Sequence, residues 1–509
     1  MTRVARTGAL LGVLLFGCQT DEGADSGARL VDCGAEAKCG AIEVFEDREA
    51  GSGRELSIAV VVIPATGNNR AADPVFVLAG GPGQGAASIA QWVAPRLEAV
   101  SRDRDLVFVD LRGTGTSAPL ACAFEDYEDL GEMLAAEFHP ERLADCLASY
   151  ADTDLSQYST AAAMADLEQV RAALGYEQIN FLAVSYGTRG ALDYAKRHPD
   201  RVRSMVLDGV VPLDRQVYRE LPRSSERALT RVLDDCKADR ECDAAFPGLA
   251  RELEQVLTEL ETNRRLIELT NPQTGVLERV DVTRSGFLGS LRMALYSNES
   301  AALIPLIVHS AYRGDYGPVA ALTLRSGKHA KSLSLGLYLT VSCAEEMAGI
   351  DEAGLREAVA DLRWFDAKPL ADLKTACSLW RPAALPADFA EPAEVATPTL
   401  LLSGDYDPVT PPSFAEHVAS QLGDARHVVV ETVHHGVWWR GCAPGVLAEF
   451  FTDPRPAALD VACLAELPAT RFFLSPNGPR PLGLREPSKP SVQKLGDDHP
   501  ELAAKENHR

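Results

Sequence analysis

The sequence predicts an α/β fold with a mostly parallel central sheet and a large helical cap inserted into it. Short apolar runs alternate with helical patterns through much of the chain, as strands and helices do in a parallel sheet. Between about residues 213 and 392 the strand pattern disappears, and apolar residues recur at helical spacing instead. The length of 509 residues also exceeds one ordinary core, which favours a core with an insertion.

The strands and helices of the core can be placed by their apolar patterns. Strands are expected at residues 56–63, 75–79, 106–110, 179–184, 203–207, 399–403 and 427–431. A helix is expected over residues 161–174, where Gly175 closes the pattern. A second helix is expected over residues 188–197, because Pro199 prevents its extension. An all-helical insertion between two strands of this sheet would cover its upper edge as a lid.

The chain divides into six predicted segments. They are a signal peptide (1–17), a tether (18–32), a first part of the core (33–212), a helical cap (213–392), a second part of the core (393–474) and a disordered tail (475–509). The tail is assigned because it is rich in Pro, Lys and Asp and poor in apolar residues.

The N-terminus predicts export. Arg3 and Arg6 precede an apolar run over residues 9–17 that is too short to cross a bilayer, which is typical of a signal peptide. The segment Leu15-Phe16-Gly17-Cys18 resembles a bacterial lipobox. This resemblance implies cleavage before Cys18 and a lipid anchor on it, which would hold the protein to the cell envelope. The alternative is an ordinary secreted protein, and both interpretations place the folded part in an oxidising compartment.

The cysteines support this compartment. The chain has eleven, and removing Cys18 leaves an even number, as a disulfide framework requires. We expect them to pair in sequence order: Cys33 with Cys39, Cys122 with Cys146, Cys236 with Cys242, Cys343 with Cys377, and Cys442 with Cys463. No CxxC or HxxxH spacing accompanies them, so no metal site is expected.

The charge of the chain excludes one class of partner. Asp and Glu total 73 against 50 Lys and Arg, which gives a net charge of −23. So acidic a surface repels phosphate backbones, and no nucleic-acid partner is expected.

A candidate nucleophile follows the strand expected at residues 179–184. Ser185 has Ala183 two residues before it and Gly187 two residues after it, and a helix follows at once. Small neighbours at this spacing are typical of a nucleophile elbow, a tight strand-to-helix turn that lifts a serine hydroxyl above the sheet. The alternative is a chance Ser-x-Gly turn.

A glycine-rich segment over residues 79–85 follows the strand at 75–79 and indicates an oxyanion hole. Its sequence, AGGPGQG, lets backbone N–H groups approach a developing negative charge. The amides of Gly81 and Tyr186 are the candidates. A phosphate-binding loop is the rival interpretation, but the Gly-Lys-Ser/Thr ending is missing.

The candidate acid and base follow two later strands. Asp407 lies in the turn after the strand at 399–403, where Asp405 competes with it for the role. His435 follows the strand at 427–431 and is preceded by His434. The resulting order of serine, acid and histidine is the one used by α/β-hydrolases. The predicted cap accounts for the long separation between Ser185 and the acid.

These motifs together resemble one group of enzymes. GGPGQG, DLRGTGTS (110–117), AVSYGTRGAL, GDYDPVTPP and HHG are similar to the proline iminopeptidase and tripeptidyl aminopeptidase group of α/β-hydrolases, over roughly residues 39–451. By motif match, Ser185 is the nucleophile, Asp407 the orienting acid and His435 the general base. The chain departs from the group at Ala79 and His434, where the group usually has histidine and glycine.

The resemblance implies a serine aminopeptidase that removes single prolyl-type residues or tripeptides from peptides with a free N-terminus, without a metal or other cofactor. Such an enzyme must bind an ammonium group, and a carboxylate near the nucleophile is the physical solution. Glu345 and Glu346, at the end of the cap, are the candidates. Trp438 and Trp439 either line the pocket or pack in the core.

Two other functions fit the same residues. A carboxylesterase or lipase would use the same triad on an ester. More distantly, the chain could be a non-catalytic surface lipoprotein built on a hydrolase scaffold.

Overall fold

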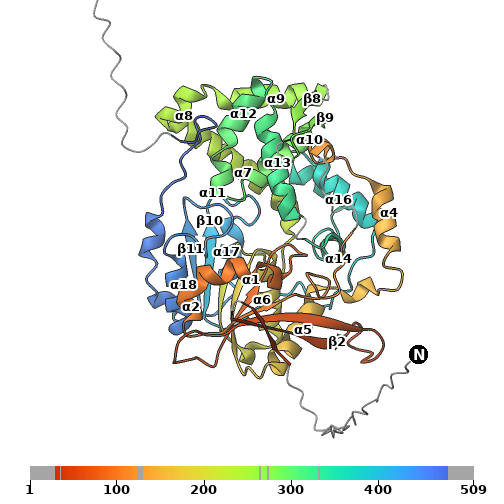
Figure 1. Cartoon of the computed structure of the whole chain (residues 1–509), viewed down its shortest axis with the longest axis vertical. Coiled ribbons are helices and arrows are strands. Elements are labelled where there is room, and N and C mark those ends of the chain that lie inside the picture. Colours follow the sequence, from red (N-terminus) through yellow and green to blue (C-terminus); the bar gives the residue numbers. More distant parts are fainter. Residues whose placement is uncertain are drawn as a thin grey trace, which may run out of the picture.

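The computed structural model describes residues 29–34, 36–122, 130–262, 265–271, 274–330 and 333–479 (Figure 1). The predicted signal peptide, Cys18 and most of the tether lie outside these residues, as does the tail from residue 480 onward. No helix in the described part of the chain is long and apolar enough to cross a membrane.

A nine-stranded sheet forms the centre of the molecule, in the order β1-β2-β3-β5-β4-β6-β7-β10-β11. Its strands are β1 (Val31–Gly34), β2 (Ala37–Phe45), β3 (Glu55–Ile63), β4 (Val75–Leu78), β5 (Leu106–Val109), β6 (Ile179–Val184), β7 (Val202–Asp208), β10 (Thr399–Gly404) and β11 (Ala425–Val430). The first three strands pair antiparallel with their neighbours, and the six from β5 to β11 are parallel. All seven predicted strands are present, and the sheet is mostly parallel as predicted.

Strands β1 and β2 were not predicted, and β1 begins inside the segment expected to be the tether. Polar and small residues interrupt both strands, and β1 is exposed along its length, so neither shows a strong apolar pattern. Their position is set by pairing, because β2 lies in antiparallel register with β3 along nearly its whole length.

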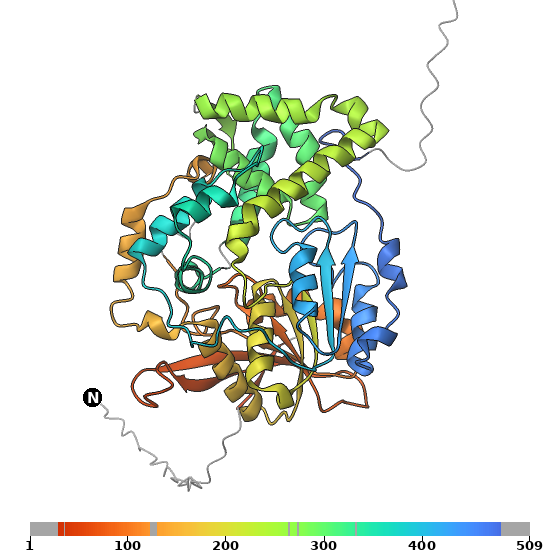
Figure 2. The ribbon, with the colours of Figure 1, turned by 180° about the vertical axis from the view of Figure 1, so that it is seen from behind.

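Helices cover both faces of the sheet (Figures 1 and 2). Helices α5 (Thr160–Ala173), α6 (Tyr186–Arg197) and α17 (Pro412–Ala419) pack with one set of strand side chains, such as Phe76. The opposite face, which includes Val75, packs against α1 (Ala86–Val93), α2 (Glu98–Ser101) and α18 (Ala443–Thr452). This alternation of neighbouring strand residues between two cores is expected of a sheet buried on both sides.

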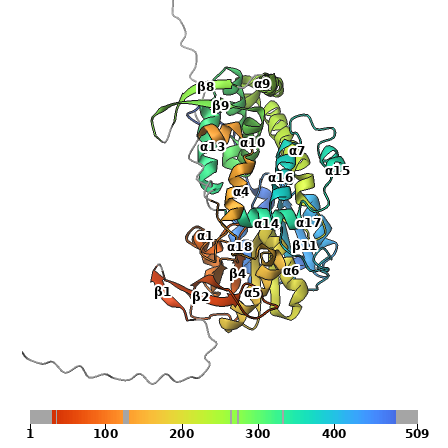
Figure 3. The same cartoon turned by 90° about the vertical axis from the view of Figure 1, so that its right-hand side faces the viewer.

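A cap lies between β7 and β10 in the sequence and above the ends of the parallel strands (Figure 3). Its helices are α7 (Val217–Ala238), α8 (Arg240–Ala245), α9 (Leu249–Thr262), α10 (Arg284–Ala294), α11 (Asn298–Ala301), α12 (Ile304–Tyr312), α13 (Gly317–Ala330), α14 (Leu335–Glu345), α15 (Glu352–Ala358) and α16 (Lys368–Leu379). The expectation of an all-helical insertion was wrong in one place. An antiparallel hairpin, β8 (Arg265–Thr270) with β9 (Leu277–Val282), lies within it, and its interspersed charges hid the strand pattern.

The cap also recruits a segment that was assigned to the core. Helix α3 (Leu130–Ala135) precedes α4 (Pro140–Ala148), and both lie between β5 and α5 in the sequence. Leu130 and Leu134 are fully buried in the cap's own hydrophobic core. The Thr283 hydroxyl, at the start of α10, donates a hydrogen bond to the Ala135 carbonyl at 2.8 Å. The first part of the core is therefore not one continuous unit from residue 33 to residue 212.

Five disulfides pair the ten cysteines in the predicted sequence order. Cys343–Cys377 joins α14 to α16 within the cap, and Cys442–Cys463 joins the start of α18 to the chain that follows it. Such a set of structural disulfides indicates that the folded part of the protein is exported to an oxidising compartment.

Candidate active site

Ser185 occupies a strained turn between β6 and α6. Its backbone has φ 56° and ψ −128°, a combination that non-glycine residues rarely adopt. The turn is held because the Ser185 N–H donates to the Asp208 carbonyl at 2.8 Å. Gly187 is needed because a Cβ there would lie 2.7 Å from the carbonyl oxygens of Leu78 and Ala79. This is the geometry expected of a nucleophile elbow.

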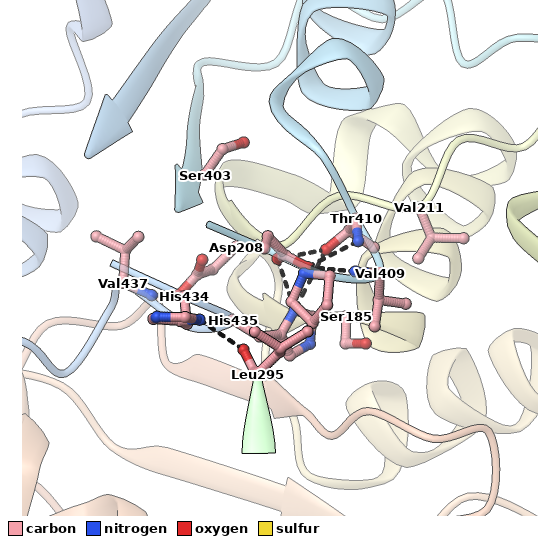
Figure 4. Close-up of polar contacts among 12 residues, drawn as sticks. Ser185, Asp208, Val211, Leu295, Ser403, Val409, Thr410, His434, His435 and Val437 are labelled. Carbon is pink, nitrogen blue, oxygen red and sulfur yellow. Dashed lines mark hydrogen bonds and ion pairs between the residues drawn. The ribbon is translucent and has the colours of Figure 1, made fainter. Parts of the chain in front are cut away.

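The loops after β10 and β11 bring Asp407 and His435 together. Figure 4 shows His435 beside Ser185 and Thr410. The His435 Nδ1 atom lies 2.7 Å from the Asp407 Oδ2 atom. The other carboxylate oxygen of Asp407 accepts the N–H groups of Val409 and Thr410, both at 2.8 Å. These bonds fix the carboxylate, which then orients the imidazole.

The electrostatics of this pair suit a general base. Burial raises the pKa of Asp407, but the His435 charge and the hydrogen bonds to the carboxylate outweigh it, so that the pKa lies below its ordinary value. Burial lowers the pKa of His435, but Asp407 more than offsets this, and the pKa lies above 6.5. Asp407 therefore stays ionised and strengthens the basicity of the ring.

The two competing residues face elsewhere. Asp405 forms an ion pair with Arg231 of helix α7. The Nδ1 atom of His434 lies 2.7 Å from the Leu295 carbonyl oxygen, and burial lowers the pKa of this histidine to about 4. The geometry thus brings together Asp407 and His435, and it separates them from Asp405 and His434.

The predicted oxyanion donors flank the serine. Tyr186 is the first residue of α6, directly after Ser185, so its N–H has no acceptor within the helix. Gly81 lies in the wall of the same cavity as Ser185. Within the described residues, neither amide donates a hydrogen bond to a protein group. Both are available to a substrate oxygen.

A cavity of about 860 Å³ lies between the loops that carry Ser185 and His435 and the cap. Ser185 and His435 are part of its wall, together with residues of α7, α10 and α16. Trp438 and Trp439 also line it, and Trp92 contacts both rings edge-on with centroids 5.7 and 5.9 Å away. No group of three or more potential metal ligands lies together in the described part of the chain.

Glu345 and Glu346 do not line this cavity. Arg189 of helix α6 lies 2.6 Å from a Glu346 oxygen and 3.5 Å from a Glu345 oxygen. Glu345 also accepts the N–H of Thr160 at 3.0 Å, and both glutamates are buried. This placement contradicts the prediction that either glutamate holds a substrate ammonium. Both carboxylates are committed to a buried cluster that joins α6 to the end of α14.

Asp208, at the end of β7, was not predicted. It is fully buried, and its Oδ2 atom accepts the N–H groups of Val437 and Trp438, both at 2.7 Å. Its Oδ1 atom has no hydrogen-bond partner within the described part of the chain, and burial raises its pKa to about 7. Asp208 thus holds the loop that follows His435. An acidic residue directly after an apolar strand was the signal that could have identified it.

Thr410 is a second residue that the sequence analysis missed. Its hydroxyl donates to the Asp407 Oδ2 atom at 2.8 Å and lies 3.3 Å from the His435 Nδ1 atom. Thr410 therefore supports the same carboxylate oxygen that contacts the histidine. Its position three residues after the acid gave no separate signal.

The DLRGTGTS motif has a structural role. Arg112 is almost fully buried and forms two hydrogen bonds with the carboxylate of Asp166 on α5, at 2.6 and 2.7 Å. The Asp110 carboxylate accepts the N–H of Ala87 at 2.8 Å and that of Thr116 at 3.0 Å. The motif therefore fastens the loop after β5 to α1 and α5, beside the glycine-rich segment.

Comparison with known proteins identifies the family. A family model of the alpha/beta hydrolase fold matches residues 73–441. The serine protease Hip1 of Mycobacterium tuberculosis is 27% identical over 427 residues, which cover 76% of this chain and 79% of that protein. The tripeptidyl aminopeptidase of Streptomyces coelicolor is 30% identical over 203 residues, 35% of this chain and 37% of that one. A solved proline iminopeptidase from Mycobacterium smegmatis covers 82% of this chain and 99% of its own, at 17% identity and a TM-score of 0.35. The protein belongs to the α/β-hydrolase fold family.

Proposed function

We propose that the protein is a serine peptidase in which Ser185 is the nucleophile, His435 the general base and Asp407 the orienting acid. The observation that carries this proposal is the 2.7 Å contact between Asp407 and His435 beside the strained turn of Ser185. Its relatives include one protein named a serine protease and one named a tripeptidyl aminopeptidase. The chemistry is the acyl transfer for which this arrangement is suited.

Each step uses the residues around Ser185. His435 takes the hydroxyl proton as the serine oxygen attacks the scissile carbonyl carbon, and the resulting oxyanion meets the N–H groups of Gly81 and Tyr186. The C–N bond then breaks, and the leaving amine takes the proton from His435. Water attacks the acyl-enzyme with His435 as base, which releases the acid and restores Ser185.

The finer proposal is that the enzyme removes residues from the free N-terminus of peptides. The motif resemblance supports it, and so does the cap, whose helices form part of the wall of the cavity at Ser185. Because Glu345 and Glu346 do not line the cavity, we place the substrate ammonium at another carboxylate. Among the described residues, the acidic side chains that line the cavity are Asp366, just before α16, and Asp372, within α16. Each is paired with a cation, Asp366 with Arg284 and Asp372 with Lys368, and a substrate ammonium would take the place of that cation. We assign amine recognition to this pair.

A panel of substrates tests the proposal. Aminoacyl and tripeptidyl arylamides, their N-blocked forms and p-nitrophenyl esters would be compared on the wild type and on Ser185→Ala. We expect hydrolysis of the free arylamides, loss of rate on N-blocking, and no turnover by the folded Ser185→Ala variant. A fluorophosphonate probe should label the wild type and an exposed-serine control, Ser378→Ala, but not Ser185→Ala. Turnover by Ser185→Ala would overturn the triad, and indifference to N-blocking would overturn the aminopeptidase assignment.

Ester hydrolysis is the second candidate. The chain is 27% identical to the carboxylesterase B of Mycobacterium tuberculosis over 190 residues, which cover 34% of this chain. The triad serves an ester as well as an amide. Faster turnover of the esters than of every arylamide, with no effect of N-blocking, would favour this function.

We also propose that a lipid at Cys18 anchors the exported enzyme to the cell envelope. The lipobox-like segment before Cys18 supports this. Incorporation of a labelled fatty acid into the wild type, and its loss in Cys18→Ala, is the expected result. Equal labelling of both proteins would exclude this anchor.

A further inference from the structure

We propose that Arg292, in the cap wall of the cavity, binds a carboxylate of the substrate close to the scissile bond. This inference rests on the proposed function and names a feature of its substrates: an acidic peptide. None of the motifs that indicated the triad includes this residue.

The position of Arg292 follows from one face of helix α10. Ser285, Leu288, Gly289, Arg292, Met293 and Tyr296 line the cavity at helical spacing. Tyr296 packs edge-on against His435, with ring centroids 5.4 Å apart. Arg292 lies in the last turn of α10, and Tyr296 lies in the turn that follows the helix, so the two residues line neighbouring parts of the same wall.

Arg292 differs from the other cations around the cavity. Lys368, the other Lys or Arg among the described residues of the cavity wall, is paired with Asp372 at 2.5 Å. Arg284, on the same helix as Arg292 but outside the wall, lies 3.5 Å from Asp366. Within the described residues, no carboxylate lies within ion-pair distance of Arg292. A partly buried cation in a largely apolar cavity is poorly compensated, and an anion placed there would stabilise it.

The surroundings of Arg292 suit a carboxylate. Tyr296 and Tyr338 line the cavity with Arg292, and the positive charge of Arg292 acts to lower the pKa of each phenol. Burial raises the pKa of both phenols, so their hydroxyls remain protonated and can donate hydrogen bonds. A guanidinium offers two parallel N–H groups, which match the two oxygens of a carboxylate.

The shared cavity limits where that carboxylate lies in the substrate. Arg292 and Ser185 line the same cavity, and one extended residue spans about 3.3 Å, so we place the carboxylate within two residues of the scissile bond. The carboxylate is either an Asp or Glu side chain or the C-terminal group of a short peptide. Both present the same chemistry to Arg292.

Matched pairs of peptides test this assignment. Glu would be compared with Gln at each of the two positions on either side of the cleaved bond, and a C-terminal carboxylate with its amide. The measured quantity is the ratio of kcat/KM for the acidic and neutral members of each pair. It would be determined for the wild type, Arg292→Gln and Arg292→Lys. Arg279→Gln, on the exposed hairpin of the cap, is the matched control.

We expect the wild type to favour one acidic member by roughly ten- to hundredfold, as a charge-assisted contact allows. Arg292→Gln should bring that ratio of kcat/KM values near one. Arg292→Lys should give an intermediate ratio, and Arg279→Gln should give the same ratio as the wild type. The pair that responds distinguishes a side chain from a C-terminus. A wild-type ratio near one for every pair, or a ratio unchanged by Arg292→Gln, would overturn the inference while leaving the peptidase intact.

Binding provides a readout that does not depend on turnover. Ser185→Ala would be titrated with the same peptide pairs by calorimetry, alone and combined with Arg292→Gln. A preference for the acidic peptide that disappears in the double variant supports the carboxylate site even if no peptide is cleaved. Equal binding of both members by Ser185→Ala would contradict it, and failure of cleavage alone would count only against the proposed function.

Discussion

The two sides of the cavity differ in how they are built. We call the loops that carry Ser185, Asp407 and His435 the floor of the cavity, and the cap helices that face them the roof. On the floor, the Asp407 carboxylate is held by two backbone N–H groups and a hydroxyl, all from the same short loop. The roof is formed by cap helices that present mainly apolar and aromatic side chains, with a few charges at separate points. Under the proposed function, the floor would carry out the reaction, because its geometry is fixed locally, and the roof would select the substrates.

One buried cluster connects these two regions. Arg189 lies on the helix that begins after the nucleophile, and Glu345 and Glu346 lie at the end of a cap helix. Burial raises the pKa of Glu345 to about 7, although Arg189 opposes this shift. The cluster joins α6 of the core to the end of α14 of the cap. The two glutamates contact Arg189 and therefore do not line the cavity.

The largest expected effect is on kcat and comes from removing the charge of Asp407, the proposed orienting acid in the floor. Asp407→Asn should lower kcat by about 10⁴-fold with the fold retained, because the histidine loses the charge that orients it. Asp405→Asn, two residues away, should change kcat by less than about threefold, since Asp405 pairs with Arg231 on the cap. Steady-state kinetics on one arylamide checks both. Equal losses in the two variants would refute the assignment of the acid.

A second effect comes from breaking the connection between floor and roof. Arg189→Met leaves two buried carboxylates without their cation and should lower the free energy of unfolding by about 3–5 kcal/mol. Arg279→Gln removes an exposed pair with Glu268 and should cost about 0–1 kcal/mol. Urea unfolding followed by fluorescence measures the difference. Similar midpoints for the two variants would mean that the cluster does not hold the cap.

The pH dependence sharpens the description of the floor. His435 must be neutral to accept the serine proton, and Asp407 holds its pKa above 6.5. The rate kcat/KM should therefore rise about tenfold per pH unit below that pKa and level off above it. Titration of His434 should not contribute to this rise of kcat/KM with pH, because the pKa of His434 lies at about 4. A midpoint clearly below 6.5 in the pH profile would contradict the Asp407–His435 interaction.

The smallest expected effect concerns the roof. Glu345→Gln should leave the ratio of rates on free and N-blocked arylamides unchanged, because Glu345 does not line the cavity. Asp372→Asn should lower that ratio by about tenfold if this carboxylate meets the substrate ammonium. If Glu345→Gln lowered this ratio and Asp372→Asn did not, Glu345 and not Asp372 would be the residue that binds the substrate ammonium.

The sequence predicted most of the floor and less of the roof. Ser185, Asp407 and His435 all lie at or shortly after the ends of strands with apolar runs, so the local pattern indicated them as candidates. The sequence did not predict strands β8 and β9, because charged residues interrupt their apolar pattern. Helix α3 was assigned to the core because nothing in its own residues shows that Leu130 and Leu134 pack with a segment more than 90 residues later.

The amino-acid sequence by itself determined the parallel strands, the elbow at Ser185, the order of the proposed triad and the pairing of nearby cysteines. Each strand, the elbow and each cysteine pair has a signal in residues that are close together in the chain. The sequence favoured Asp407 and His435 by motif match, and only the tertiary structure shows the contact between them, the different partners of Asp405 and His434, and the position of Glu345 outside the cavity. Neighbouring residues of the same type carry the same local signal, and what separates them is the direction of each side chain, which depends on partners such as Arg231, Leu295 and Arg189 from distant helices.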